Sequence, residues 1–539
     1  MNTNTNVLDG LDKVLERVRR NTLGDLLARS RERMPEKFAL AYKDHRLNYA
    51  ELDDFVNQTA HAFMNDGMKK GDMITVMSKN SLDFTIVNFA LARIGAVMIP
   101  INYMLTVEDV AYILEHAEVD GFIASEEYAP ILDEATGRLV IKYRYLMDVV
   151  SVDKLADNLS SWKPLITARQ GQSTDLVDAE IADDDLAHVL YTSGTESRPK
   201  GVMLTHKSII SEYMSCIIDG HMSESDVLIH ALPLYHSAQL HCFLGPSIYL
   251  GSSGIILPGA SPELILETIE KEAATQLFCP PTVWIALLRH PDFDKRNLST
   301  LEKCYYGAAI MPREILKELS ERLPNARFWN FYGQTEVAPL ATALQPGDQL
   351  SKLGSAGKPT LNMQTKIVDE NDVELPRGEV GEIVHRTPHA MKGYLHDPEK
   401  TAEAFKGGWF HSGDLGVMDE EGYITIIDRK KDMINTGGVN VSSREVEETI
   451  YQLEGVSEVA VISIPDKYWI EAVTAIIVPK DGAVLTKEDV IDYCKQKLSS
   501  FKVPKYVDFT DSLPKNPSGK VLKRSLRDQY EDLGGNEEQ

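Results

Sequence analysis

Cysteine is scarce in this chain, with five residues among 539. The cysteines are far apart in the sequence and lack the spacing of metal ligands; they are Cys216, Cys242, Cys279, Cys304 and Cys494. This pattern favours scattered, buried thiols in a reducing cytosol over a disulfide framework or a zinc site.

Long apolar runs are also missing. No segment approaches the roughly 18 consecutive apolar residues that a membrane-spanning helix needs. The stretch 1–20 is polar, mixes acids with bases, and lacks the apolar core of a secretory signal. We therefore expect a cytoplasmic protein without an integral membrane segment.

Basic residues are outnumbered by acidic ones. The 56 Lys and Arg residues against 81 Asp and Glu residues leave a formal net charge of −25. This charge repels DNA, RNA and anionic lipid at long range, so we expect no nucleic-acid partner. Any anionic small molecule must be held by local lysines and arginines.

A chain of this length is too long for one hydrophobic core and predicts more than one domain. Its first part alternates strand and helix patterns, as a βαβ unit does. The expected strands are 74–77, 96–101 and 121–124, and the expected helices are 49–65, 82–93 and 107–116. The pattern predicts an α/β fold with a large N-terminal body of several subdomains.

The pattern changes after Asp428. The charged cluster 428–432 is expected to be a linker. Beyond it, the predicted helices are 444–453 and 487–498, and the predicted strands are 458–464 and 472–478. These elements predict a small α+β C-terminal domain.

The loop 191–201 reads YTSGTESRPKG and lies between two short apolar segments that are expected to be strands. Gly194 allows close approach of the backbone and Lys200 adds a positive charge, which suits the oxygens of a polyphosphate. The hydroxyl donors are Thr192, Ser193 and Thr195. The loop is not a Walker A motif, because a strand pattern follows its lysine in place of a helix. Taken alone, it could also be a surface turn.

Four further segments follow in the chain: NFYGQTE at 330–336, SGDLG at 412–416, DRKKD at 428–432 and PKNPSGK at 514–520. With the loop 191–201 they resemble, in order and spacing, the adenylate-forming superfamily of acyl-CoA synthetases, nonribosomal adenylation domains and beetle luciferases. The resemblance covers nearly the whole chain. It implies that a carboxylate attacks the α-phosphate of ATP and expels pyrophosphate. A thiol, that of CoA in the synthetases, then attacks the mixed anhydride and releases AMP.

The resemblance implies three catalytic residues besides a gate. Lys520 would bridge the carboxylate and the α-phosphate, and the turn before it can present a side chain at its tip. Glu336 would bind Mg²⁺ and Thr335 would face the α-phosphate, which fits the oxygen ligands of a hard cation. Taken alone, Lys520 could be a surface lysine, and Thr335–Glu336 could be the start of a helix.

Nucleotide contacts are implied for a second set of residues. Tyr332 would stack on adenine, and Gly333 follows it in the same segment. Asp414 would accept hydrogen bonds from the ribose hydroxyls, and Arg429 would add a fork of donors on the ribose or phosphate side. Without the resemblance, both could be charges of a surface turn and a linker. The residues that would border the base are Asn330, Gly307, Ala308 and Ala309.

The resemblance also implies a CoA path and a hinge. Gly437 and Gly438 would line a narrow tunnel for pantetheine, since missing side chains leave room for a thin ligand. Trp469 matches an aromatic position near the CoA nucleotide, although it could be a core residue. Lys431 matches the inter-domain hinge, so we expect an N-terminal domain 1–430 and a mobile C-terminal domain 431–539.

The acid substrate is predicted from two segments that resemble the bacterial fatty-acyl branch, ALPLYH at 231–236 and YGAA at 306–309. They predict a medium- to long-chain fatty acid, with His236 as a gate to the acyl pocket or else a core histidine. His241 has no matching role. An aromatic, short or branched acid, a separate carrier protein in place of CoA, a regulator without chemistry and a homodimer stay open.

Two residues depart from the pattern of the superfamily. Glu196 stands where most relatives have glycine, and a carboxylate near a triphosphate is unfavourable unless it faces away or meets the metal. Ile470 stands where glycine is common, directly after Trp469.

Overall fold

The structure is a computed structural model that describes residues 11, 14–149, 156–192, 198–309, 311–437, 439–466, 468–480, 482–515, 521–531 and 533. Among these residues, no helix combines the length and the apolar character that crossing a membrane requires.

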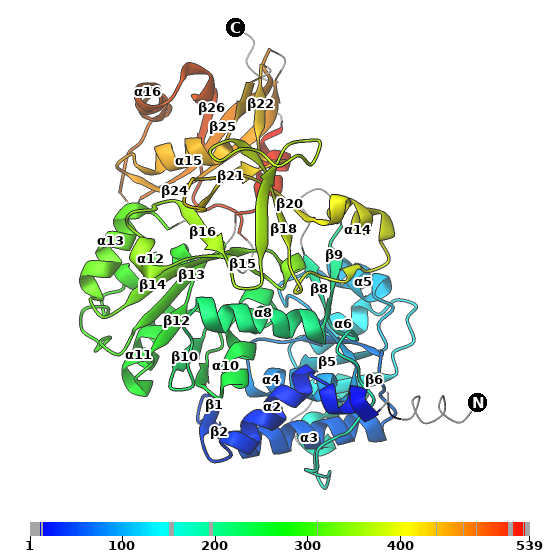
Figure 1. Ribbon diagram of the computed structural model, residues 1–539. Helices are drawn as coiled ribbons and strands as arrows, with labels where there is room; N and C mark the ends of the chain where they lie inside the picture. The colour runs from blue at the N-terminus through cyan, green and yellow to red at the C-terminus, as the bar shows by residue number, and fades with distance from the viewer. Residues whose placement is uncertain are drawn as a thin grey trace.

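Two large sheets form the N-terminal body (Figure 1). Within the described residues the first has thirteen strands, and its centre is parallel. The parallel strands, in spatial order, are β14 (Arg327–Gly333), β13 (Lys303–Gly307), β12 (Gln276–Phe278), β10 (Val227–His230), β11 (Ser253–Ile256) and β1 (Phe38–Tyr42), and β2 (His45–Asn48) closes this edge antiparallel to β1.

The other half of this sheet is antiparallel and, with β14, brings three of the motif segments of the sequence together, those at 330–336, 412–416 and 428–432. Its strands, outward from β14, are β15 (Leu340–Leu344), β16 (Ser355–Pro359), β21 (Ile424–Arg429), β20 (Phe410–Met418), β18 (Val380–Arg386) and β17 (Gln364–Val368). Asp414 of β20 lies opposite Arg429 of β21.

The second sheet has eight strands within the described residues. In spatial order they are β19 (Gly393–Tyr394), β9 (Lys200–Thr205), β8 (Leu186–Thr192), β4 (Val97–Pro100), β3 (Met73–Met77), β5 (Gly121–Ser125), β6 (Tyr143–Met147) and β7 (Lys163–Pro164). β8 and β9 pair antiparallel with Thr192 opposite Lys200, so the two ends of the phosphate-type loop are fixed on neighbouring strands.

Helices cover both sheets. Most begin with the capping residues that their sequences offer; α3 (Tyr49–Asn65), for example, starts after Asn48, which forms a capping box with Glu51. The other helices of the body are α2 (Leu23–Arg33), α4 (Leu82–Ile94), α5 (Val107–His116), α6 (Ala129–Ala135), α7 (Leu165–Ala168), α8 (His206–Asp219), α9 (Ser237–Gln239), the π-helix η3 (Leu240–Leu244), α10 (Gly245–Leu250), α11 (Pro262–Glu272), α12 (Pro281–Arg289), α13 (Arg313–Arg322) and α14 (Pro398–Ala404). Short 3₁₀ turns are η2 (Asp157–Leu159), η4 (Thr335–Val337), η5 (Pro346–Asp348), η6 (Lys406–Gly408) and η7 (Ser500–Lys502).

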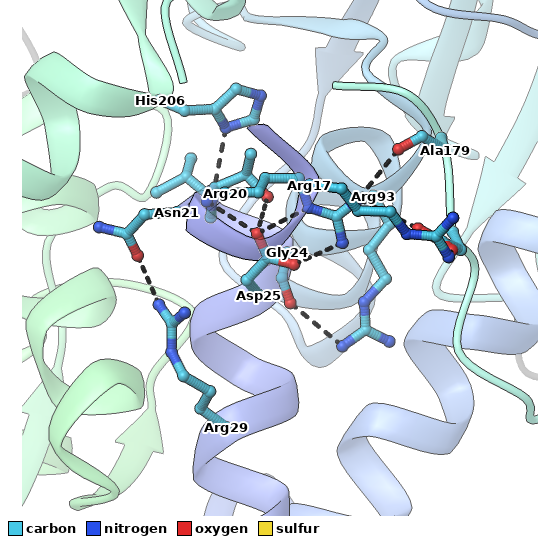
Figure 2. A network of polar contacts seen from close by, with 12 residues as sticks. Arg17, Arg20, Asn21, Gly24, Asp25, Arg29, Arg93, Ala179 and His206 are labelled. Atoms are coloured by element: carbon cyan, nitrogen blue, oxygen red, sulfur yellow. Dashed lines mark hydrogen bonds and ion pairs between the residues drawn. The ribbon is translucent and has the colours of Figure 1, made fainter. Parts of the chain in front are cut away.

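A polar network fixes the first long helix, α2, to the body (Figure 2). Arg20 pairs with Asp25 at 2.7 Å and donates to the Ala179 carbonyl at 3.0 Å. The Leu23 N–H donates to Nδ1 of the buried His206 at 3.3 Å, which ties the start of α2 to α8.

A smaller sheet with its own core forms the C-terminal part, at the top of Figure 1. Its elements are β22 (Ile434–Thr436), β23 (Val439–Val441), α15 (Ser443–Tyr451), β24 (Val456–Asp466), β25 (Ile470–Pro479), α16 (Lys487–Lys497), β26 (Tyr506–Phe509) and α17 (Lys523–Tyr530). The predicted fold class, a large α/β body with a small α+β domain, is confirmed.

Two expectations from the sequence are wrong. The cluster 428–432 is not wholly a linker, since Asp428 and Arg429 end strand β21 and Asp428 is only 6% exposed.

The five cysteines are buried and free as expected, but they are not all scattered, because two of them lie close together. Cys216 and Cys242 donate to the same oxygen of buried Glu212, at 3.0 and 3.3 Å.

Candidate functional site

The end of strand β14 is the centre of the candidate site. Tyr332, near the end of this strand, donates its hydroxyl to Oδ2 of Asp414 at 2.6 Å. Arg429 lies on the other side of the same carboxylate, with Nε 3.3 Å from Oδ1. Burial and this carboxylate raise the pKa of Tyr332 well above its usual value. The structure therefore joins three sequence-predicted residues in one contact set.

Gln334 completes this contact set, although nothing in the sequence pattern singled it out. Its amide nitrogen donates to Asp414 Oδ2 at 3.0 Å and to the Ser412 carbonyl at 2.8 Å. Asp414 is only 4% exposed, so its charge is held by three neighbours and not by solvent. A carboxylate has about four acceptor sites, which leaves capacity for a ligand hydroxyl.

The neighbouring strand β13 brings the small residues 307–309 to the same edge. Gly307 lies opposite Phe331, and a Cβ at this position would be 2.4 Å from the Phe331 carbonyl oxygen. Ala308 has a positive φ of 63°, which turns the chain sharply after the strand, and Ala308 and Ala309 are exposed. Asn330 donates to the Ser355 carbonyl at 3.1 Å, which orients its side chain between β14 and β16.

Beyond Gln334, the short turn η4 carries Thr335 and Glu336 toward the second sheet. The Tyr394 hydroxyl donates to Oε1 of Glu336 at 3.1 Å, and Lys200 Nζ lies 4.8 Å from the centre of the Tyr394 ring. Burial and Glu336 raise the pKa of Tyr394. One tyrosine thus links the predicted phosphate lysine to the predicted metal ligand, and sequence reasoning missed it because β19 is only two residues long.

His236 lies on the other side of Thr335. Ser237 Oγ and Thr335 Oγ1 are 3.2 Å apart, and His236 Nδ1 accepts the Ala238 N–H at 3.3 Å at the start of α9. His236 is half-buried. The structure therefore places the predicted gate residue beside the predicted catalytic threonine.

A separate pair lies in the C-terminal part. Gly437 donates its N–H to the Trp469 carbonyl at 2.6 Å, and a Cβ on Gly437 would be 3.2 Å from the indole ring. Lys505 Nζ lies 4.7 Å from the centre of that ring. Among the described residues, no hydrogen bond, ion pair or ring contact joins Trp469 to Tyr332, Glu336 or Asp414.

Lys431 lies between the last strand of the body, β21, and the first strand of the C-terminal sheet, β22. Three residues before it, Asp428 Oδ2 accepts hydrogen bonds from the N–H and the hydroxyl of Ser443, both at 2.7 Å. Directly after it, Asp432 pairs with Arg527 at 2.6 Å. The predicted hinge position is thus flanked by two contacts that reach α15 and α17.

Several predicted residues lie outside the described residues: Ser193, Gly194, Thr195, Glu196, Gly438 and Lys520. The residues next to Lys520 are described, and Lys515 and Val521 form an antiparallel bridge on either side of that segment.

The residues at η4 fit a hard cation. The Glu336 carboxylate is half-buried, and among the described residues no Lys or Arg forms an ion pair with it. Its neighbours are the hydroxyl groups of Thr335 and Tyr394, so the local donors are oxygens, as Mg²⁺ prefers.

Two sequence profiles match the chain. The AMP-binding enzyme profile matches residues 27–395, and the AMP-binding enzyme C-terminal domain profile matches residues 445–520.

Curated relatives extend over nearly the whole chain. A feruloyl-CoA synthase from Amycolatopsis is 32% identical and covers 95% of this chain and 100% of the relative. The long-chain-fatty-acid–CoA ligase FadD13 from Mycobacterium tuberculosis is 33% identical and covers 90% of this chain and 94% of the relative.

Among solved structures, MatB from Rhodopseudomonas palustris is similar in two forms. Both are 30% identical and cover 95% of this chain and 100% of MatB. The TM-score is 0.85 for the ATP-bound crystal structure and 0.74 for the apo structure.

Proposed function

The chain belongs to the AMP-binding enzyme family of the adenylate-forming superfamily and is an AMP-forming CoA ligase, and on this premise we propose that its acid substrate is a medium- to long-chain fatty acid. ATP and CoA are the co-substrates of such ligases. The reaction converts carboxylate, ATP and CoA into acyl-CoA, AMP and pyrophosphate.

For the first half-reaction we assign the adenosine part of ATP to the contact set around Asp414. Tyr332 would stack on adenine between Asn330 and residues 307–309, and Asp414 would accept the ribose hydroxyls next to Arg429. The triphosphate would lie along Thr192, Lys200 and the loop 193–195. The main support is a continuous row of contacts at the end of β14. Tyr332 and Gln334 contact Asp414 at one end of the row. Glu336, two residues after Gln334, is linked through Tyr394 to Lys200 at the other end.

Catalysis of this step rests on positioning and on neutralising charge. A substrate carboxylate oxygen bonds to the α-phosphorus, and the bond to the β-phosphate oxygen breaks, so pyrophosphate leaves. Thr335 would face the α-phosphate, His236 would border the acid, and Lys520 would bridge the two anions. A Mg²⁺ ion held by Glu336 would supply positive charge to the phosphate oxygens.

For the second half-reaction we assign Gly437, Gly438 and Trp469 to the pantetheine path. The CoA thiol loses its proton and its sulfur bonds to the acyl carbon, while the bond to AMP breaks. No dedicated base is required, because a thiol of pKa about 8.5 is already a few per cent thiolate at neutral pH. We propose rotation about Lys431 between the steps, with domains 1–430 and 431–539.

The fatty-acid class is supported by the surroundings of the acid end. Phe331 precedes Tyr332, and it packs with Phe243, Phe278 and Tyr305 in a buried apolar cluster. Phe243 belongs to η3, which begins four residues after His236. An acyl chain that extends from His236 would meet these apolar side chains, and each buried methylene would contribute about 0.8 kcal/mol.

An aromatic acid is the second candidate, because the same cluster presents stacked rings. The Phe243 and Phe278 ring centres are 4.5 Å apart and nearly parallel, and Phe243 and Phe331 are 6.0 Å apart. Aromatic acids favour such offset-stacked neighbours. The similarity to a feruloyl-CoA synthase points the same way.

AMP release from ATP and Mg²⁺ across a panel of acids, with and without CoA, tests the proposal. For a fatty-acid substrate, KM should fall by about fourfold per added methylene up to an optimum length, as expected from about 0.8 kcal/mol for each group. Use of cinnamic or benzoic acids alone would favour the aromatic class. Pyrophosphate exchange without any use of CoA would point to a carrier-protein acceptor.

Lys520→Ala tests the division between the two steps. We expect loss of ATP–pyrophosphate exchange, because the charge that bridges the two anions is removed, while thioester formation from a supplied acyl-adenylate largely remains. Equal loss of both half-reactions would contradict this assignment. Lys515→Ala, which removes a nearby lysine paired with Glu458, is the matched control.

A further inference from the structure

Three buried polar side chains form a continuous chain of hydrogen bonds from helix α4 through strand β8 to the π-helix η3. His188 of β8 makes two hydrogen bonds. Its Nδ1 is 2.8 Å from Nε2 of His241 in η3, and its Nε2 is 2.8 Å from Oδ1 of Asn88 in α4. His188 and Asn88 are 1% and 2% exposed, and His241 is fully buried. We call Asn88, His188 and His241 the histidine bridge.

Both rings are neutral at physiological pH. Burial lowers the pKa of His241 to about 3, with a further contribution from nearby His236. Burial and His241 lower the pKa of His188 well below its usual value. Two adjacent imidazolium rings in this core would repel each other and lack solvent, so the bridge holds by neutral hydrogen bonds.

The amide oxygen of Asn88 sets the tautomers of both rings. It accepts a hydrogen bond from the His188 Nε2–H, so His188 Nδ1 must accept a hydrogen bond from the His241 Nε2–H. His241 Nδ1 then keeps a free lone pair, and this atom is buried without a hydrogen-bond partner among the described residues. The reverse assignment would leave a buried N–H unpaired there, which is the rarer arrangement.

The two histidines of the bridge lie near, in the sequence, the predicted phosphate loop and the predicted acid site. His188 is four residues before Thr192 on the strand that enters the phosphate-type loop. His241 is four residues after Ser237, whose hydroxyl contacts Thr335. His241 is in a π-helix, a rare form of helix that occurs often at functional sites.

We propose that the histidine bridge is a positioning device that fixes the His236–Ser237 turn relative to strand β8, and so holds the acid in line with the α-phosphate. The proposal rests on the placement of the acid at His236 in the proposed function. The bridge touches neither substrate; its members act through the backbone of β8 and η3.

The effect on rate follows from geometry. In-line attack requires the acid oxygen close to the phosphorus, and a misplacement of about 1 Å can reduce a rate by about 10²-fold. His241→Leu removes the only N–H that the bridge can offer to His188, and leaves the His188 lone pair buried and unpaired. We therefore expect the pyrophosphate exchange rate to fall by about 10- to 100-fold with a raised KM for the acid, while KM for ATP changes little.

Two further variants separate positioning from general stability. His241→Gln retains an N–H in a similar place and should restore most of the exchange rate. His206→Leu removes another buried imidazole and serves as the matched control. Within the described part of the chain, this imidazole accepts one hydrogen bond, from the Leu23 N–H at the start of α2 (Figure 2). We expect His206→Leu to lower the melting temperature about as much as His241→Leu does, with unchanged kinetics.

The proposal is overturned if His241→Leu loses stability but keeps wild-type kinetics, or if it raises both KM values equally. Should His241→Leu fail to fold, Asn88→Leu makes the same test from the other end of the bridge. If the wild-type protein shows no exchange with any acid, the proposed function fails, and ¹⁵N-histidine NMR still tests the bridge. Asn88→Leu should change the tautomer signals of two coupled histidines, and unchanged signals would overturn the bridge itself.

Discussion

Asp414 illustrates how much one side chain can organise. One oxygen of its carboxylate accepts hydrogen bonds from Tyr332 and Gln334, and the other oxygen forms an ion pair with Arg429. The motifs SGDLG and DRKKD predicted Asp414 and Arg429 separately, through the resemblance to the superfamily. Only the register of β20 and β21 shows that the two residues are neighbours. Gln334 and Tyr394 could not be predicted, because their roles come from contacts between strands that are distant in sequence.

We expect Asp414→Asn to raise KM for ATP by about 10- to 100-fold, since hydrogen bonds to a charged group contribute about 1.5–3 kcal/mol each. ATP–pyrophosphate exchange at varied ATP concentration measures this change. Asp419→Asn is the control, because it keeps the Oδ1 acceptor for Tyr423 and Glu421 and loses only the partly exposed bridge to Lys352. An unchanged KM for ATP in Asp414→Asn would contradict the ribose assignment.

Glu212 predicts a pH-dependent stability. Burial raises its pKa to about 8 from the ordinary 4.5, so the folded protein keeps a neutral acid that the unfolded chain ionises. The stability that this neutral form contributes is complete below pH 4.5 and is lost as pH rises toward 8. Glu212→Gln cannot ionise, so its stability relative to wild type should increase by about 1.4 kcal/mol per pH unit across this range.

Urea unfolding at pH 5, 6, 7 and 8 measures this difference. Glu270→Gln, at an exposed carboxylate paired with Arg296, should show a constant difference over the same range. A constant difference for Glu212→Gln as well would mean that Glu212 is ionised in the folded protein.

At the scale of single elements, local sequence was a good guide where one signal dominated. The helices 49–65 and 107–116 have the predicted limits, because a capping box marks each start and apolar periodicity marks each length. The prediction of a linker at 428–432 was wrong in part, because a cluster of charged residues is usually solvated, whereas Asp428 is buried against the N-terminus of α15. Likewise, spacing along the chain could not show that Cys216 of α8 and Cys242 of η3 meet at Glu212.

The turn into β25 carries a strained residue that the sequence had marked as unusual. Ile470 has a φ of 71° and is 64% exposed, so a β-branched side chain occupies the left-handed region with little packing to offset it. Left-handed backbone costs a non-glycine residue about 1–2 kcal/mol, and glycine loses about 0.5–1 kcal/mol of entropy on folding.

Ile470→Gly should therefore stabilise the protein by about 0.5–1 kcal/mol, seen as a higher urea midpoint for the C-terminal part. Val439→Gly, at an exposed residue of strand β23, should lower that midpoint instead. A loss of stability in Ile470→Gly would show that the isoleucine side chain contributes contacts that outweigh the strain.

At the scale of the whole molecule, the structure is more similar to one form of a relative than to another. The two MatB structures have the same identity to this chain and the same coverage, but their TM-scores are 0.85 for the ATP-bound form and 0.74 for the apo form. Strand β21 is joined to the start of α15 by Asp428, which accepts hydrogen bonds from Ser442 and Ser443. The side chains of Ser442 and Arg444 also donate to the carbonyls of Ile427 and Ile426.

Asp428→Ala should loosen the C-terminal part without unfolding the body. The carboxylate caps the N-terminus of α15 and accepts hydrogen bonds at 2.7 Å from both the N–H and the hydroxyl of Ser443, so its loss should cost about 2 kcal/mol or more locally. Amide hydrogen exchange should then rise in 439–451 while β13 and β14 keep their protection. Asp489→Ala, which removes a similar cap from α16 away from the hinge, should raise exchange only in 487–497. If Asp428→Ala leaves exchange in α15 unchanged, then Asp428 does not hold the two parts together, and the hydrogen bonds from Ser442 and Arg444 to the carbonyls of Ile427 and Ile426 are sufficient.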